Sequence, residues 1–158
     1  MTRREIRDRI FKIVFTMEFC SPEEVDEQLQ MALDSSLPGD EDDDPLLYAD
    51  VEDKDRAYMT DKVMGIVSHK DEIDSIISDI SEGWKLSRIG KEELAILRLG
   101  VYELKFDDTI PDKVAINEAV ELAKKYCDAS AGGFINALLA KLVKKDTDNT
   151  KGSEDATD

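Results

Sequence analysis

The chain has 158 residues, of which 41% are hydrophobic and 37% are charged, and its formal net charge is −16. This length fits one domain with a real hydrophobic core, and the apolar content excludes a chain that is disordered throughout. So strong an acidity normally opposes binding to nucleic acid, because phosphates are repelled.

The residue types present argue against several classes of protein. The chain is charged from Arg3 onward, so we expect no signal peptide, and no run of about 18 apolar residues predicts a membrane span. Cys20 and Cys127 are far apart, which fits a reducing cytoplasm without a disulfide or zinc site. His69 is the one histidine, in a polar junction where we expect it to be exposed. We therefore predict a non-catalytic cytoplasmic protein without metal or cofactor.

The negative charge is concentrated in two segments. Residues 37–55 carry a net charge of −8 and residues 146–158 carry −4, which together make 12 of the 16 net negative charges. The first segment has proline and glycine beside an acidic run and predicts a solvated loop between two lobes. The second lacks large apolar residues and predicts a disordered acidic tail.

Helical periodicity marks the first two elements. Thr2 can cap a helix that runs to about Phe19. Ser21 then precedes Pro22 and stands three residues before Glu24, a capping-box arrangement that begins a second helix ending near Leu33.

Apolar residues at helical spacing predict five more helices after the acidic loop, and no alternating pattern predicts a strand. The apolar or capping positions that mark them are Tyr58–Val67, Ile73–Ile80, Ser87–Leu104, Val114–Tyr126 and Ser130–Leu142. We therefore predict an all-α fold of about seven helices in two small bundles. The N-terminal lobe would span about 1–55 and the C-terminal lobe about 56–145, within a helical domain of residues 1–145.

The first helix has a basic start. Residues 1–12 carry a local charge of +3, mostly from arginines. On a helical wheel the aliphatic residues share one face, whereas Phe11 and Phe15 lie beside the arginines. Arginine binds phosphates and aromatic rings stack on unpaired bases, so one interpretation is an RNA-facing stripe. The alternative is that both phenylalanines pack on the second lobe while the arginines form surface ion pairs.

Four motifs follow one another in the C-terminal half. They are WKLSRI at 84–89, AILRLGVYEL at 95–104, IPDKVAINEAVELAK at 110–124 and FINALL at 134–139. In this order they resemble the NusB family of bacterial transcription antitermination factors, and the resemblance extends over about residues 2–144. It implies a helical protein of two bundles that binds the boxA element of ribosomal RNA leader transcripts. It also implies a heterodimer with NusE, a small-subunit ribosomal protein, in an antitermination complex with RNA polymerase. Some relatives self-associate, so a homodimer is a further expectation.

The resemblance also implies the residues of two binding surfaces. On the RNA side they are Arg3, Arg4, Arg7, Phe15, Lys113, Tyr126 and Phe134. On the NusE side they are Glu93, Arg98 and Tyr102, of which the last two also have a structural interpretation. Two departures stand out: Phe15 occupies a position that is usually tyrosine, and Gly132-Gly133 stand where the family often has a basic residue before Phe134. The second departure implies one phosphate contact fewer.

Two other functions are alternatives to this one. The chain could be a helical protein-interaction adaptor that does not bind RNA directly and whose acidic surface serves another partner. A related helical domain occurs in ribosomal RNA cytosine methyltransferases, but here we expect no room for a cofactor-binding α/β domain. The few basic side chains predict weak RNA affinity for the chain alone and tighter binding with NusE.

Overall fold

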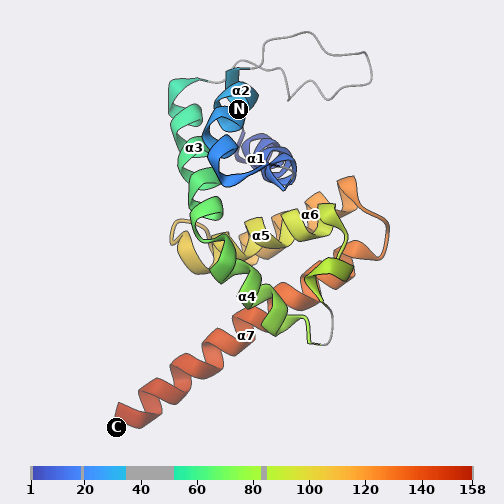
Figure 1. Cartoon of the computed structure of the whole chain (residues 1–158). Helices are drawn as coiled ribbons and strands as arrows, with labels where there is room; N and C mark the ends of the chain where they lie inside the picture. Colours follow the sequence, from blue (N-terminus) through green and yellow to red (C-terminus); the bar gives the residue numbers. More distant parts are fainter. Residues whose placement is uncertain (1, 19, 35–51, 83–84, 158) are drawn as a thin grey trace. The chain divides into compact units, whose positions relative to one another are not determined.

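The chain forms two compact helical units, residues 1–68 and residues 69–158. The computed structural model describes residues 2–18, 20–34, 52–82 and 85–157. Those ranges contain seven α-helices and no strand, which confirms the predicted all-α fold (Figure 1). Most of the predicted acidic loop, together with Trp84 of the first family motif, lies outside the described residues.

The first unit contains three helices and one short turn of 3₁₀-helix. In chain order these are α1 (Arg3–Met17), η1 (Pro22–Glu24), α2 (Val25–Asp34) and α3 (Asp53–Ser68). Helix α1 packs against both α2 and α3. The core of this unit is mostly aliphatic, and Ile10, Leu29, Met59 and Val63 are fully buried within it.

A buried arginine closes the end of α2. Arg9 is 1% exposed, and its Nη2 donates a hydrogen bond of 3.0 Å to the carbonyl oxygen of Ala32. The last carbonyls of a helix have no partner within that helix, so this bond satisfies one of them. Burial, with a smaller contribution from the charge of Arg56, lowers the pKa of Arg9. Arg9 is therefore part of the framework of the first unit.

The first helix begins as its sequence predicts, whereas the second does not. The hydroxyl of Thr2 accepts from the Glu5 backbone at 3.1 Å, and the Glu5 carboxylate accepts from the Thr2 backbone at 2.8 Å, which completes a capping box. The capping bond predicted for Ser21 is absent. The backbone N–H of Glu24 instead donates to the Ser21 carbonyl at 3.0 Å, because residues 22–24 form a 3₁₀ turn.

Helix α3 begins earlier, and the first unit ends later, than predicted. The acidic loop was expected to reach residue 55, but Asp53 and Asp55 lie in the first turn of α3. Carboxylates are favourable at this end of a helix because its N-terminus carries partial positive charge. Since α3 packs against α1, it belongs to the first unit, and the division falls after Ser68 instead of near residue 55.

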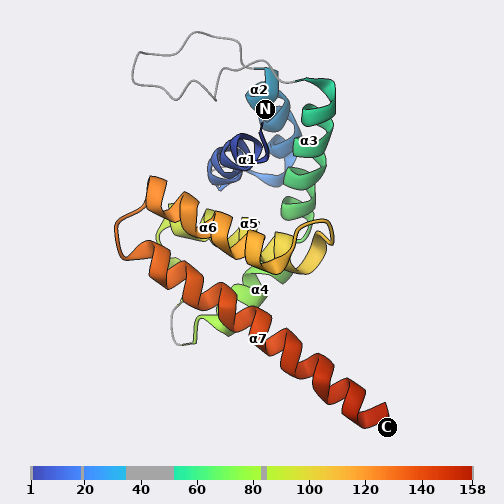
Figure 2. The same cartoon turned by 180° about the vertical axis from the view of Figure 1, so that it is seen from behind.

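The second unit is arranged around α5. Its elements are α4 (Lys70–Ile80), η3 (Leu86–Arg88), α5 (Lys91–Phe106), α6 (Asp112–Tyr126) and α7 (Ala131–Thr157). Helix α5 contacts α4, α6 and α7, and Figure 2 shows α6 and α7 lying side by side. Every residue from 94 to 101 is buried, so α5 is the central helix of this unit.

The last helix is longer than predicted. The sequence predicts a disordered tail over residues 146–158, but α7 continues to Thr157. No proline follows Pro111, and adding residues to an existing helix avoids the cost of nucleating a new one. The helix therefore continues beyond the residues of α7 that pack on α4, α5 and α6.

A glycine sets the distance between α5 and α7. A Cβ atom added to Gly100 would lie 2.9 Å from Cδ1 of Leu139, which is closer than real contacts allow. Leu139 is itself fully buried, so its methyl group has little room to move. Gly133 of α7 offers the contrast, because nothing lies within 4 Å of a Cβ added there.

A buried ion pair joins α4 to α5. Arg98 is 7% exposed, and its Nε and Nη2 donate to the two carboxylate oxygens of Asp74 at 2.8 and 3.0 Å. This bidentate geometry is specific to arginine, since lysine presents a single point charge.

These glycines generate the first prediction. We expect Gly100→Ala to lower the free energy of unfolding by about 1–2 kcal/mol, because overpacking outweighs the gain in helix propensity. We expect Gly133→Ala to raise it by about 0.5–1 kcal/mol, because alanine favours the helix and meets no neighbour. Urea unfolding of both variants measures this, and shifts of the same sign would contradict the close approach of α5 and α7.

The ion pair generates the second prediction. We expect Arg98→Ala to lower the free energy of unfolding by about 1–3 kcal/mol, because Asp74 loses its hydrogen-bonded partner. Arg98→Lys should recover only part of the loss. Arg88→Ala removes an exposed arginine on η3 and serves as the control, with an expected change within about 0.5 kcal/mol. Equal effects at positions 98 and 88 in urea unfolding would show that the pair contributes nothing.

Candidate nucleic-acid interface

Only part of the predicted arginine stripe is on the surface. Arg3 and Arg4 are exposed in the first turn of α1, and the guanidinium carbon of Arg3 lies 4.8 Å from the centre of the Tyr58 ring on α3. This cation–π contact orients Arg3. In contrast, Arg7 is 7% exposed, as a helical wheel of α1 alone could not show. The accessible basic group of α1 is therefore smaller than its composition predicts.

The two phenylalanines of α1 differ in exposure. Phe11 is 3% exposed and belongs to the core, so of the two interpretations its burial agrees with packing and not with a surface stripe. Phe15 is half-buried, and its ring centre lies 6.4 Å from that of Phe11. Phe15 therefore keeps an edge toward solvent while it packs on a core ring.

Lys113 lies in a pocket between α6 and α7. The pocket has a volume of about 480 Å³ and is lined by Lys113, Val114, Ile116, Asn117 and Asn136. The first four come from the beginning of α6, and the last comes from α7. Lys113 and both asparagines are exposed. The sequence motifs contained both asparagines, but only the packing of two helices brings them together.

Tyr126 and Phe134 lie at the other end of α6. Tyr126 is the last residue of α6, about 20 Å along the helix axis from Lys113, so the structure does not bring these two residues together. Its ring lies 5.2 Å from Nζ of Lys125. Phe134 is in the first turn of α7, and both rings are half-buried.

The start of α7 is capped by a residue that the sequence analysis did not select. The Asp128 carboxylate accepts hydrogen bonds from Ser130 N, Ser130 Oγ and Ala131 N at 3.0, 2.7 and 3.1 Å. These bonds, the one from the Ser130 hydroxyl above all, lower the pKa of Asp128. Asp128 therefore provides the cap that was predicted for Ser130 and holds the helix start that carries Phe134.

The residues expected to bind NusE are partly structural. Glu93 is half-buried in the first turn of α5, whereas Arg98 is committed to Asp74. Tyr102 is half-buried, with its ring centre 5.7 Å from that of Phe106. His69 is half-buried instead of exposed, because its ring lies 4.3 Å from the Phe106 ring.

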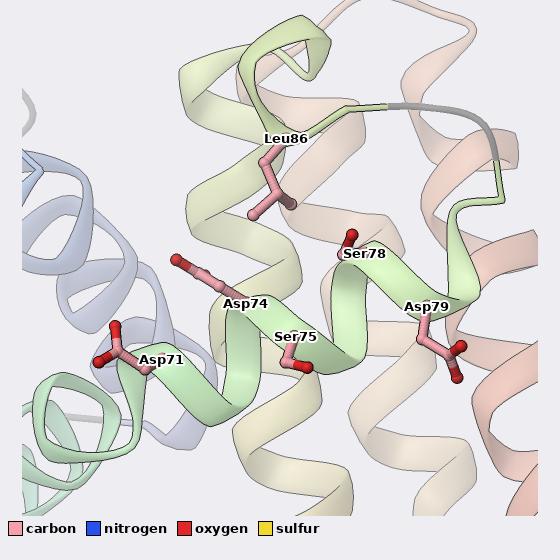
Figure 3. A pocket seen from close by; sticks show the side chains of 6 residues that line it. All are labelled: Asp71, Asp74, Ser75, Ser78, Asp79 and Leu86. Carbon is pink, nitrogen blue, oxygen red and sulfur yellow. The ribbon is translucent and has the colours of Figure 1, made fainter.

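A second pocket, which the sequence analysis missed, is acidic. It has a volume of about 630 Å³ and is lined by Asp71, Asp74, Ser75, Ser78, Asp79 and Leu86 (Figure 3). Polar residues at spacings of three and four along α4 were the signal that could have found it. Asp74 pairs with Arg98, and Asp79 pairs with Lys145, whose hydrogen bond lowers the pKa of Asp79. Two of its three carboxylates are thus paired, but no cation is among its lining residues, so we expect it to favour phosphate less than a pocket with a lysine.

The described residues contain little that could support catalysis. Burial, followed by the charges of Glu93, Glu92 and Asp128, raises the pKa of Cys127 to about 11, so the thiol is protonated at neutral pH and is a poor nucleophile. Within the described ranges, no three histidine, cysteine or acidic side chains are placed to hold a metal ion. Over the same ranges, no helix has the length and apolar character needed to span a membrane.

Comparisons with known proteins agree with this geometry. The model of the NusB family matches residues 4–144. The transcription antitermination protein NusB of Agathobacter rectalis is 45% identical over 143 residues, which cover 90% of this chain and 100% of that protein. The same protein of Acetivibrio thermocellus is 40% identical over 154 residues, covering 98% of this chain and 97% of the relative.

Solved structures give the same result. NusB of T. maritima superposes with a TM-score of 0.72 at 30% identity, covering 91% of this chain and 92% of that one. A chain from the crystal structure of the antitermination factors NusB and NusE with double-stranded RNA superposes with a TM-score of 0.68 at 27% identity. The match covers 90% of this chain and 96% of that one. The match spans most of the chain and nearly the whole of each relative, and this chain therefore belongs to the NusB family.

Proposed function

We propose that this protein is a non-catalytic transcription antitermination factor that binds boxA-type RNA of ribosomal RNA leader transcripts together with NusE. The observation that carries the proposal is the family match over residues 4–144, combined with cationic and aromatic side chains at the surface of helices that the match covers. In this role the protein joins the RNA polymerase antitermination complex and supports processive transcription of ribosomal RNA.

The proposed RNA-binding residues fall into two groups. Arg3, Arg4 and Phe15 on α1 keep exposed surface, and so do Lys113, Tyr126 and Phe134 in the second unit. Arginine and lysine would bind phosphates, while the half-buried rings would stack on unpaired bases. Arg7 is buried, so we propose that it stabilises the first turns of α1 and does not contact RNA directly.

The proposed NusE surface lies on α4 and α5. Glu93 and Tyr102 are half-buried and could contact a partner directly, whereas Arg98 would act by holding Asp74 in the acidic pocket. Carboxylates at the mouth of this pocket would suit basic side chains of a protein partner. The complex of NusB with NusE and RNA, formed by a protein 27% identical to this one, supports NusE as the partner.

A second candidate function is an adaptor that does not touch RNA. The burial of Arg7 and Arg9 favours it, because it leaves α1 with fewer accessible cations than its composition predicts. The acidic pocket favours it as well, since it provides a surface for a protein partner. The two functions differ in whether the exposed arginines of α1 contribute to RNA binding.

Titration of boxA RNA with and without NusE tests the proposal. We expect weak binding by the protein alone and tighter binding with NusE, because few basic side chains are accessible. The variant Arg3→Ala/Arg4→Ala should weaken binding and make its dependence on salt shallower, whereas Arg88→Ala should not. Equal affinity with and without NusE would contradict the heterodimer, and an unchanged affinity of the double variant would favour the adaptor.

A gain of function is expected at Gly133. This exposed position precedes Phe134, and open space surrounds it. Gly133→Lys should raise the affinity for boxA RNA by about two- to fivefold at low salt, because it adds one phosphate contact. Gly133→Ala also replaces the glycine but adds no charge, so it should leave the affinity unchanged. If both variants bind more tightly by the same factor, helix rigidity and not charge is the cause.

A further inference from the structure

The pocket between α6 and α7 has unusual electrostatics for so acidic a chain. None of its five lining residues carries a carboxylate, and one of them, Lys113, is cationic. The acidic pocket on α4 has the opposite character, since three of its six lining residues are aspartates. A negatively charged ligand would be repelled at α4 and tolerated at the pocket between α6 and α7.

Two exposed amides converge on this pocket from separate helices. Asn117 stands one turn after Lys113 on α6, and Asn136 faces the pocket from α7. Within the described part of the chain, neither amide forms a side-chain hydrogen bond. Each therefore has its donor and its acceptor available to a ligand.

The walls of the pocket belong to two helices that pack against each other. Ala115 and Ala119 of α6 are buried, and so are Ile135 and Leu139 of α7, so the two helices are held together by packed side chains. Val114 is 43% exposed and Ile116 is half-buried, which gives the pocket an apolar surface beside the amides. The backbone that carries the amides is already ordered, so only side-chain freedom is lost when they bind.

This combination suits an unpaired nucleobase. A base presents adjacent donors and acceptors at its edge, which an asparagine amide can pair with two hydrogen bonds. Its face needs an apolar surface, and its phosphate needs a cation. A volume of about 480 Å³ lies within the range of small-molecule sites, ~300–1,000 Å³.

We infer that Asn117 and Asn136 recognise the edge of one unpaired RNA base seated in this pocket, while Lys113 holds the adjacent phosphate. The inference rests on the proposed RNA binding and adds to it the residues that select sequence. Lys113 contributes affinity that is independent of sequence, because phosphates are common to all RNA. The asparagines contribute the preference for one base over others.

Competition between two RNAs tests this inference. Affinities of the full-length protein with NusE are measured for boxA RNA and for a scrambled RNA of equal length and composition. Asn117→Ala and Asn136→Ala should each weaken boxA binding by about tenfold and scrambled binding by less than about twofold. Lys113→Ala should weaken both by a similar factor and make the salt dependence shallower. Gln28→Ala removes a side-chain amide from α2 and is the matched control. We expect it to change the affinity for neither RNA.

A second pair of variants separates hydrogen bonding from folding. Both asparagines are exposed, so we expect both alanine variants to remain folded. Thermal melting followed by circular dichroism measures this. Asn136→Asp keeps the size of the side chain but loses its donor and gains a charge. It should weaken boxA binding more than Asn136→Ala does.

The outcomes separate this inference from the function on which it rests. Wild-type protein that binds neither RNA, even with NusE, would overturn the proposed function and the inference together. Wild-type protein that prefers boxA RNA, with asparagine variants that keep the same preference, would overturn the inference alone. So would asparagine variants that bind NusE less tightly but RNA as before, since the pocket would then be a protein-docking site.

Discussion

The complete burial of α5 between residues 94 and 101 is the constraint on which the second unit depends. A helix that is surrounded on all sides has no face that water can solvate, so each polar side chain on it needs a partner within the protein. Arg98 has one in Asp74, whose helix is thereby tied to α5. Gly100 meets the same constraint on the other side, where it lets α7 come close. The positions of α4 and α7 thus follow from what α5 requires.

The central helix also determines where the polar surface of this unit can lie. Because α6 and α7 both use small and aliphatic residues to cover α5 and each other, polar side chains such as Lys113, Asn117 and Asn136 are left on the outside. The acidic pocket arises in the same way on the outer side of α4. Packing has therefore separated an acidic pocket from one that is lined by a lysine and no carboxylate, although the net charge of the chain is strongly negative.

Sequence patterns predicted most of what depends on neighbouring residues, the Ser21 cap excepted, and missed what depends on distant ones. Helical periodicity and the Thr2 cap are local, and the structure confirms both. The burial of Phe11 depends on other helices, so a wheel drawn for α1 alone could not decide between packing and a surface stripe. The stacking of His69 on Phe106 joins residues far apart in the chain, and no pattern around His69 indicated it. The residues that line the pocket between α6 and α7 are part of the sequence motifs, but only the packing of α6 on α7 brings them together.

The capping box at Thr2 and Glu5 has a consequence for molecular recognition. Chain ends usually fray, and a basic segment that frays must be ordered whenever it binds. Here the reciprocal bonds start the helix at Arg3, and the Tyr58 ring holds that arginine from the side. Arg3 and Arg4 thus belong to an element whose conformational entropy was already lost during folding. Two arginines on a preorganised helix can contribute more affinity per charge than the same residues on a flexible arm.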